Sequence, residues 1–142
     1  MFDLSRSIDL HVISTQHTGE TAVAGTTTGM IGLCETVTWR AKHFGIWQNL
    51  TTKITEFDRP HHFTDEMVKG IFKSIRHEHH FKTVDGQTLM TDIFVYAVPF
   101  GILGSLFDRL ILKQYMTDLL TKRNGVIRSI AEGYDWGKVL PG

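Results

Sequence analysis

Residues 101–130 read GILGSLFDRLILKQYMTDLLTKRNGVIRSI, and their apolar side chains recur with the period of an α-helix. One apolar series runs from Leu103 to Leu110, and a second runs from Leu112 to Ile130 in a different phase. This change of phase predicts a bend, or a separate first turn, near Leu110–Leu112. The segment is therefore expected to form a long C-terminal helix that is interrupted close to its start.

Six candidate strands precede this helix. They are rich in Thr, Val and aromatic residues with alternating polarity, which is typical of strands. Their approximate ranges are 20–29, 34–44, 47–57, 61–71, 73–84 and 87–98. The connections are short, and Asp85-Gly86 is a two-residue hairpin signal, so neighbouring strands are expected to run antiparallel. A short helical entry is predicted between Phe2 and Ile13.

These elements predict an α+β fold. One face of an antiparallel sheet must be covered, and the C-terminal helix is the only large element left to cover it. A curved sheet that grips a helix leaves a cavity between them. We expect a single domain over residues 1–132, followed by an irregular tail over residues 133–142.

Composition excludes several classes of function. Lys and Arg number 15 and Asp and Glu number 15, so there is no electrostatic footprint for a nucleic acid. No stretch approaches the ~18 apolar residues of a membrane span, and the N-terminus lacks the apolar run of a signal peptide. A cytoplasmic protein is therefore expected. Cys34 is the only cysteine, which excludes an intrachain disulfide, and it is expected to be a buried or half-buried small hydrophobe.

The alternation of side chains separates the two faces of each strand. Large apolar groups mark the inner face, and ionisable groups share it with them. The residues expected on this face are Glu35, Trp39, His43, Asp65, Met67, His77, His79 and Phe81. In the last strand the pattern alone does not choose between the face of Met90, Asp92, Phe94 and Tyr96 and the face of Thr91, Ile93 and Val95.

Three interpretations fit these ionisable groups, because burying them is costly unless they are paired or hydrated. The first is a structural network in which carboxylates fix the tautomers of His77 and His79. The second is a mainly apolar ligand pocket whose polar groups orient a carbonyl or a hydroxyl. The third is a metal site, since His-x-His beside a carboxylate is usable ligand geometry. His-x-His alone is a weak signal, so we predict no metal and no cofactor.

No sequence motif identifies a reaction. The chain has no Gly-x-Ser-x-Gly elbow, no phosphate-binding glycine loop and no dinucleotide fingerprint. A histidine beside a carboxylate in a semi-dry cavity can act as an acid or base near neutral pH. An enzyme would therefore use His77 or His79 as the general base, with Asp92 or Asp65 as its orienting partner.

Several motifs resemble those of SRPBCC ligand-binding domains, the superfamily of START domains and birch-pollen allergens. They are FDLSRSIDLH (2–11), GLCETVTWRAKHFG (32–45), DEM (65–67), HEHHF (77–81), MTD (90–92) and PFGILG (99–104). The resemblance covers about residues 2–132 and is to a bacterial, polyketide-cyclase-like branch. It implies the helix-grip fold, with Met90, Asp92, Phe94 and Tyr96 on the inner face and the long helix as the lid of a hydrophobic tunnel. Members of the superfamily bind lipids, polyketides, sterols or hormones, and only some are enzymes.

The chain departs from this superfamily in two places. Such domains usually begin with a strand before the first helix, whereas this chain starts inside that helix, so a gap is expected between the strands that begin at Glu20 and Gln87. An unpaired edge of this length invites pairing. It predicts a homodimer through the edge, replacement of the strand by the 133–142 tail, or a chain that starts late. Cys34 stands at a turn where glycine is usual.

The leading hypothesis is a protein that binds a small, mainly hydrophobic, lipid- or polyketide-like molecule. Trp39, Met67, Phe81, Phe94 and Tyr96 would supply contact area. Glu35, His43, Asp65, His77, His79 and Asp92 would orient the ligand or supply acid–base chemistry. The alternatives are a cyclase- or hydrolase-type enzyme and a partner-binding module with an inert cavity.

Overall fold

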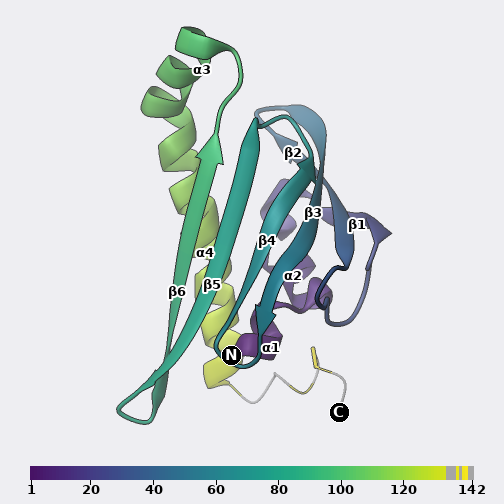
Figure 1. Cartoon of the computed structure of the whole chain (residues 1–142), viewed down its shortest axis with the longest axis vertical. Coiled ribbons are helices and arrows are strands. Elements are labelled where there is room, and N and C mark those ends of the chain that lie inside the picture. The colour runs from purple at the N-terminus through teal and green to yellow at the C-terminus, as the bar shows by residue number, and fades with distance from the viewer. Residues whose placement is uncertain (134–136, 138, 141–142) are drawn as a thin grey trace.

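Six antiparallel strands form one sheet in which the order of strands follows the order of the chain (Figure 1). The computed structural model describes residues 1–133, 137 and 139–140. The strands are β1 (Thr21–Gly25), β2 (Thr36–His43), β3 (Ile46–Asp58), β4 (His62–Lys69), β5 (Ser74–Val84) and β6 (Gln87–Ala97). Each predicted strand is present, and the predicted α+β class is confirmed.

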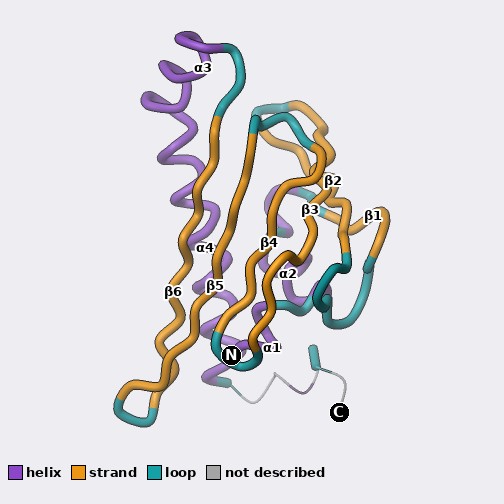
Figure 2. Tube along the Cα trace, viewed as in Figure 1, coloured by secondary structure: helices purple, strands orange, loops and turns teal. Residues whose placement is uncertain are grey.

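Helices flank the sheet in the chain and cover its inner face. Two short helices and a 3-10 turn precede it: α1 (Phe2–Ser5), α2 (Ile8–Ser14) and η1 (Gln16–Thr18). Helix α3 (Gly101–Phe107), the π-helical turn η2 (Asp108–Leu112) and helix α4 (Lys113–Glu132) follow it. Figure 2 shows the strands side by side with the long helix running behind them, and α4 contacts both α1 and α2. The predicted helical entry and the long C-terminal helix are both confirmed.

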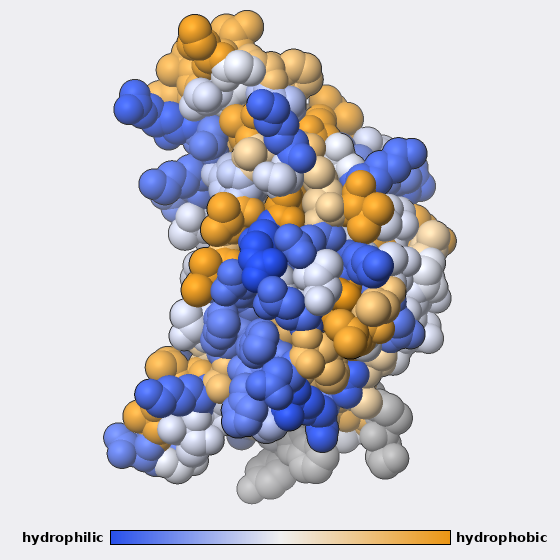
Figure 3. Space-filling view, in the orientation of Figure 1, coloured by the Kyte–Doolittle hydropathy of each residue, from blue (hydrophilic) through white to orange (hydrophobic). Residues whose placement is uncertain are grey.

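The π-helical turn explains the phase change in the apolar pattern. A π turn holds one residue more than an α turn, so the residues before it are rotated relative to those after it. The turn spans Asp108–Leu112, which includes the predicted break near Leu110–Leu112. Helix α3 extends beyond the end of the sheet, and Figure 3 shows apolar atoms gathered at that end of the molecule. Phe100, Ile102 and Leu103 there are all more than three-quarters exposed.

Turn chemistry sets the ends of several strands. The β5–β6 hairpin turns at Asp85-Gly86, as predicted, and the β2–β3 hairpin turns at Phe44-Gly45, with positive φ at all four residues. Such values fit the two-residue turns that match the twist of a sheet. Strand β1 is shorter than the predicted range 20–29. It ends at Gly25, where a Cβ would lie only 2.2 Å from the carbonyl oxygen of Thr36.

Two apolar clusters close one end of the grip. In the first, Phe2 of α1 makes edge-to-face contacts with Phe57, Phe63 and Phe81, at ring-centroid distances of 5.3–5.4 Å. In the second, Leu4 and Leu10 pack against Ile127 of α4, and Val139 and Leu140 lie against them. Residues 134–136, 138 and 141–142 of the predicted irregular tail lie outside the described residues.

The two outer strands leave the sheet open. Within the described part of the chain, β1 pairs only with β2, and β6 pairs only with β5. The expected gap between these strands is therefore present. None of the described helices has the length and apolar character needed to cross a membrane.

Cys34 departs from one expectation. The sequence predicts a buried or half-buried cysteine, but the residue is exposed. It lies in the turn before β2 with a φ of +65°, in the left-handed region that favours glycine. This backbone conformation gives a physical reason why glycine would be usual at the position.

Candidate functional site

A cavity of about 300 Å³ lies between the inner face of the sheet and the C-terminal helix. Alternate residues of β2 point into it, and one side of α4 closes it. The apolar wall includes Val37, Trp39 and Ala41 from β2, and Leu112, Met116, Leu119 and Leu120 from the η2–α4 segment. Ionisable side chains interrupt this wall at two places.

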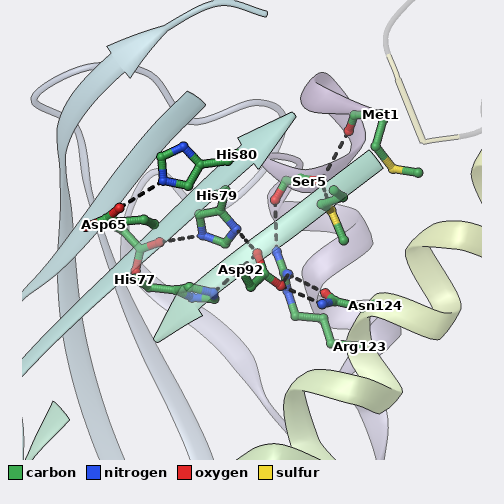
Figure 4. A network of polar contacts seen from close by, with 11 residues as sticks. Met1, Ser5, Asp65, His77, His79, His80, Asp92, Arg123 and Asn124 are labelled. Atoms are coloured by element: carbon green, nitrogen blue, oxygen red, sulfur yellow. Dashed lines mark hydrogen bonds and ion pairs between the residues drawn. The ribbon is translucent and has the colours of Figure 1, made fainter. Parts of the chain in front are cut away.

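The first polar group centres on His79, which is buried in β5 between two carboxylates (Figure 4). Its Nε2 lies 2.9 Å from Asp65 Oδ2, and its Nδ1 lies 2.9 Å from Asp92 Oδ1. The Asp65 contact is a directed hydrogen bond, whereas the Asp92 contact is close but poorly aligned and acts as an ion pair. A neutral imidazole donates from only one nitrogen, so the imidazolium form is the one that matches two ionised carboxylates.

Electrostatics agree with this protonation state. Burial alone would lower the pKa of His79, but Asp65 and Asp92 outweigh it and raise that pKa above 6.5. The same contacts outweigh the burial of the two carboxyl groups, and the pKa values of Asp65 and Asp92 are both lowered. The three groups are therefore held as an imidazolium between two carboxylates.

A second cation completes the network from the helix. Arg123 of α4 is buried, and its Nη1 lies 3.9 Å from Asp92 Oδ2. Its Nη2 donates to the backbone carbonyl of Ser5 at 3.1 Å, and the neighbouring Asn124 donates to Asp92 Oδ2 at 2.5 Å. Burial lowers the pKa of Arg123, but arginine stays protonated in proteins. Two carboxylates, one imidazolium and one guanidinium sum to zero charge.

His77 differs from His79 although the two rings are only 3.9 Å apart. Burial lowers the pKa of His77, and the neighbouring His79 lowers it further. Its Nε2 lies 3.5 Å from Asp92 Oδ1 without a directed hydrogen bond. His77 is therefore a neutral imidazole beside a charge-balanced network.

The same residues offer a geometry that a metal ion can use. One donor atom each from Asp65, His77 and His79 lies within 4.8 Å of the others. Both nitrogens of His79 already face carboxylates, so an ion would have to replace the proton on that ring. The donor set is compatible with a divalent ion, but the charge balance favours the protonated network.

Several predicted site residues do line the cavity. They are Trp39, His43, Asp65, His77, His79 and Phe94. Asp92 stands behind this wall and acts through His77 and His79. The inner face implied for Asp92 and Phe94 by the resemblance therefore agrees with the structure.

Other predicted contact residues lie elsewhere. Glu35 is exposed before β2, where it accepts a hydrogen bond from the backbone N–H of Gly32. Phe81 is buried against Phe2, because α1 fills that end of the sheet. Met67 is not among the residues that line the cavity and lies beside Gly70. Tyr96 donates its hydroxyl to Asp108 of the π turn, and burial together with this carboxylate raises its pKa to about 12.

Sequence reasoning missed Arg123 of the first polar group and all but His43 of the second, which consists of His11, Glu20, His43 and Tyr115. His11 of α2, Glu20, Tyr115 and Arg123 all line the cavity. Only the two helix residues have a sequence signal, which is their position. Tyr115 and Arg123 each lie four residues from Leu119, so the three share one side of a helix. His80, which the alternation of the strand places on the outer face, pairs there with Glu78 at 2.8 Å.

Comparison with known proteins identifies the fold. No protein-family model and no curated protein sequence matches the chain. Among solved structures, TTHA0849 from Thermus thermophilus is similar over 93% of this chain and 89% of its own, at 15% identity and a TM-score of 0.69. Ginseng major latex-like protein 151 from Panax ginseng is similar over 93% of this chain and 87% of its own, at 18% identity and a TM-score of 0.62. Ara h 8.0201 is similar over 90% of this chain and 88% of its own, at 13% identity and a TM-score of 0.59.

These similarities extend over nearly the whole of each chain at low sequence identity, so they establish a shared fold. The helix-grip architecture expected from the SRPBCC resemblance is confirmed at this level. Shared architecture does not carry a ligand or a reaction from one protein to another.

Proposed function

We propose that this protein binds a small, mainly hydrophobic molecule, of lipid or polyketide type, between the sheet and α4. The observation that supports this most directly is the cavity itself. Its volume of about 300 Å³ is at the lower end of the ~300–1,000 Å³ of ligand pockets. Its wall is mostly apolar, with a few convergent polar groups, which is the usual composition of such sites.

The residues in this proposal have distinct roles. Trp39 and Phe94 supply flat apolar contact area. Asp65 and His77 offer hydrogen bonds at the wall, and His79 holds them in place. Because the network balances its own charge, it favours a neutral oxygen of the ligand over a carboxylate or an amine.

Native mass spectrometry of the purified protein, followed by denaturing extraction, tests the proposal. A co-purifying apolar molecule is expected. Ala41→Phe should abolish its binding by filling the cavity, whereas Ala24→Phe, on the exposed part of β1, should retain it. A bound metal ion would instead favour the Asp65/His77/His79 metal site. An empty protein whose melting temperature no apolar probe raises would contradict the proposal.

A second candidate function is acid–base catalysis of the cyclase or hydrolase type, and the state of His77 favours it. A general base needs a free lone pair at neutral pH, which a neutral imidazole has and the imidazolium of His79 lacks. We therefore assign the base to His77, with Asp92 as its orienting partner and Asp65 beside it.

Hydrolysis of p-nitrophenyl butyrate tests this role. His77→Asn should lower kcat with little change in KM, and His80→Asn, on the outer face, should change neither. Turnover that survives His77→Asn, or a rate no higher than in buffer, would rule out this hydrolase activity.

A third candidate rests on the open edge of β6. This strand has no partner on one side within the described chain, and Leu89, Ile93 and Val95 near that edge are about half exposed. We propose a homodimer formed through this edge. Val95→Lys should give a monomer by native mass, and Val68→Lys on the interior strand β4 should not. A monomeric wild-type protein would contradict the dimer, and a dimer with an empty cavity would favour a partner-binding module.

A further inference from the structure

A second polar group lines the same cavity as the His79 network. It consists of His11 on α2, Glu20 before β1, His43 at the end of β2 and Tyr115 on α4. His11 stacks on Trp39 at 4.0 Å, and its Nε2 contacts Glu20 Oε1. Burial would raise the pKa of Glu20, but His11 outweighs it and the pKa is lowered. Glu20 and His11 are therefore each other's hydrogen-bond partners.

His43 and Tyr115 form the part of this group that is left for a ligand. The Tyr115 hydroxyl and His43 Nδ1 are hydrogen-bonded. Burial lowers the pKa of His43 and raises the pKa of Tyr115, so both are neutral near pH 7. When the hydroxyl donates to Nδ1, the imidazole carries its proton on Nε2. A neutral donor and a neutral phenol oxygen suit a hydroxyl or a carbonyl.

Unused hydrogen-bonding capacity also exists at the His79 network. Arg123 Nε is buried without a hydrogen-bond partner among the described residues, and His77 Nε2 has only its undirected 3.5 Å contact with Asp92 Oδ1. Both residues line the cavity. A buried donor without a partner costs free energy that an incoming acceptor can recover. Since the network is neutral overall, a neutral oxygen fits here as well.

The helix sets the distance between these two sites. Tyr115 and Arg123 are eight residues apart on α4, which corresponds to ~12 Å along the axis. Between them, Met116, Leu119 and Leu120 present apolar side chains to the cavity. The cavity is therefore polar at two ends and apolar between them.

We infer that the ligand is an elongated, mainly apolar molecule with a neutral hydroxyl or carbonyl oxygen at each end. This inference rests on the proposed function and specifies its ligand class. One oxygen lies at the His43–Tyr115 pair, and the other lies at His77 and Arg123. The apolar body lies along α4 against Trp39 and Phe94.

Displacement of 8-anilinonaphthalene-1-sulfonate by 1,8-octanediol and by 1-octanol tests this ligand class. The extended diol places its oxygens close to the separation of the two sites, whereas the alcohol can occupy only one of them. Tyr115→Phe should lower the affinity for the diol by about three- to tenfold, which is the effect of one net hydrogen bond. The affinity for the alcohol should fall less than the affinity for the diol, because the alcohol can keep its hydroxyl at the other site.

Two further variants complete the experiment. His43→Gln should reproduce the selective loss of the diol if Tyr115→Phe folds poorly, and His80→Gln, on the outer face, should change neither affinity. If the variants at Tyr115 and His43 weaken diol and alcohol equally, the second site is absent and the inference fails while hydrophobic binding stands. If neither compound nor the dye binds, the proposed function fails together with it.

Discussion

His79 and Asp92 lie directly opposite each other in the β5–β6 ladder, with Nδ1 and Oδ1 2.9 Å apart. The neighbouring β4–β5 ladder places Asp65 opposite His77. From there Asp65 reaches across to His79 Nε2, also at 2.9 Å. The network is thus a product of strand register across three strands, and α4 adds Arg123 to it from the other side of the cavity.

Removal of the helix cation should destabilise the fold strongly. Arg123→Met leaves Asp92 buried without its guanidinium and frees the carbonyl of Ser5, so the free energy of unfolding should fall by about 3–5 kcal/mol. Urea unfolding measures this loss. Arg128→Met, on the exposed side of the same helix, should have little effect. Equal losses in the two variants would show that the network contributes nothing specific.

The stabilisation from His79 should depend on pH with a defined sign. Its pKa in the folded state is raised above the unfolded value of 6.5. Its contribution is therefore full below about pH 6.5 and is lost as the pH rises through the folded-state pKa. The measurement is the difference in unfolding free energy between wild type and His79→Gln from pH 6 to 9.

This difference should shrink as the pH rises. Burial lowers the pKa of His77 in both proteins, so the comparison removes that part of its pH dependence, whereas the part caused by the charge of His79 belongs to the interaction being measured. A difference that is constant or grows with pH would show that His79 is neutral in the folded protein.

The aromatic cluster around Phe2 should be a main source of stability. Phe2→Ala removes a buried ring that contacts Phe57, Phe63 and Phe81, and it should cost about 3–5 kcal/mol in the free energy of unfolding. Phe100→Ala serves as the matched control, because Phe100 is 77% exposed. Similar unfolding midpoints for the two variants would mean that α1 does not pack against the sheet.

Glycine at the turn before β2 should stabilise the protein. Cys34→Gly relieves a positive φ at an exposed site, and we expect a gain of about 0.5–1 kcal/mol in the free energy of unfolding. Cys34→Val should lose stability, because a β-branched residue is disfavoured more strongly in this conformation. A loss in the glycine variant would contradict the strain at this position.

Local patterns predicted those parts of the fold and site that depend on neighbouring residues. Alternation placed His77 and His79 on one face, and turn signals gave the strand order that brings Asp92 to them. The phase change in the helix located the π turn. Each of these features is set by residues close together in the sequence or by one ladder of hydrogen bonds.

The remainder depends on contacts between distant segments, which no local period encodes. Phe81 points inward as expected, but α1 fills that end of the sheet and takes it into the core. Tyr96 donates a hydrogen bond to Asp108, which the π turn places beside it. Arg123 and Tyr115 have the spacing of ordinary helix residues, and only the packing of α4 against the sheet brings them to the cavity.

The position of Leu4 and Leu10 against Ile127 has a consequence for how the chain folds. Each strand of this sheet can pair with the one made just before it, so the sheet can grow along the chain without waiting for later segments. The first two helices cannot finish packing until α4, more than a hundred residues later, has formed. Closing a contact of that separation is slow. The cavity is therefore expected to be the last part of the molecule to become enclosed, after its polar groups have already been aligned by the strands.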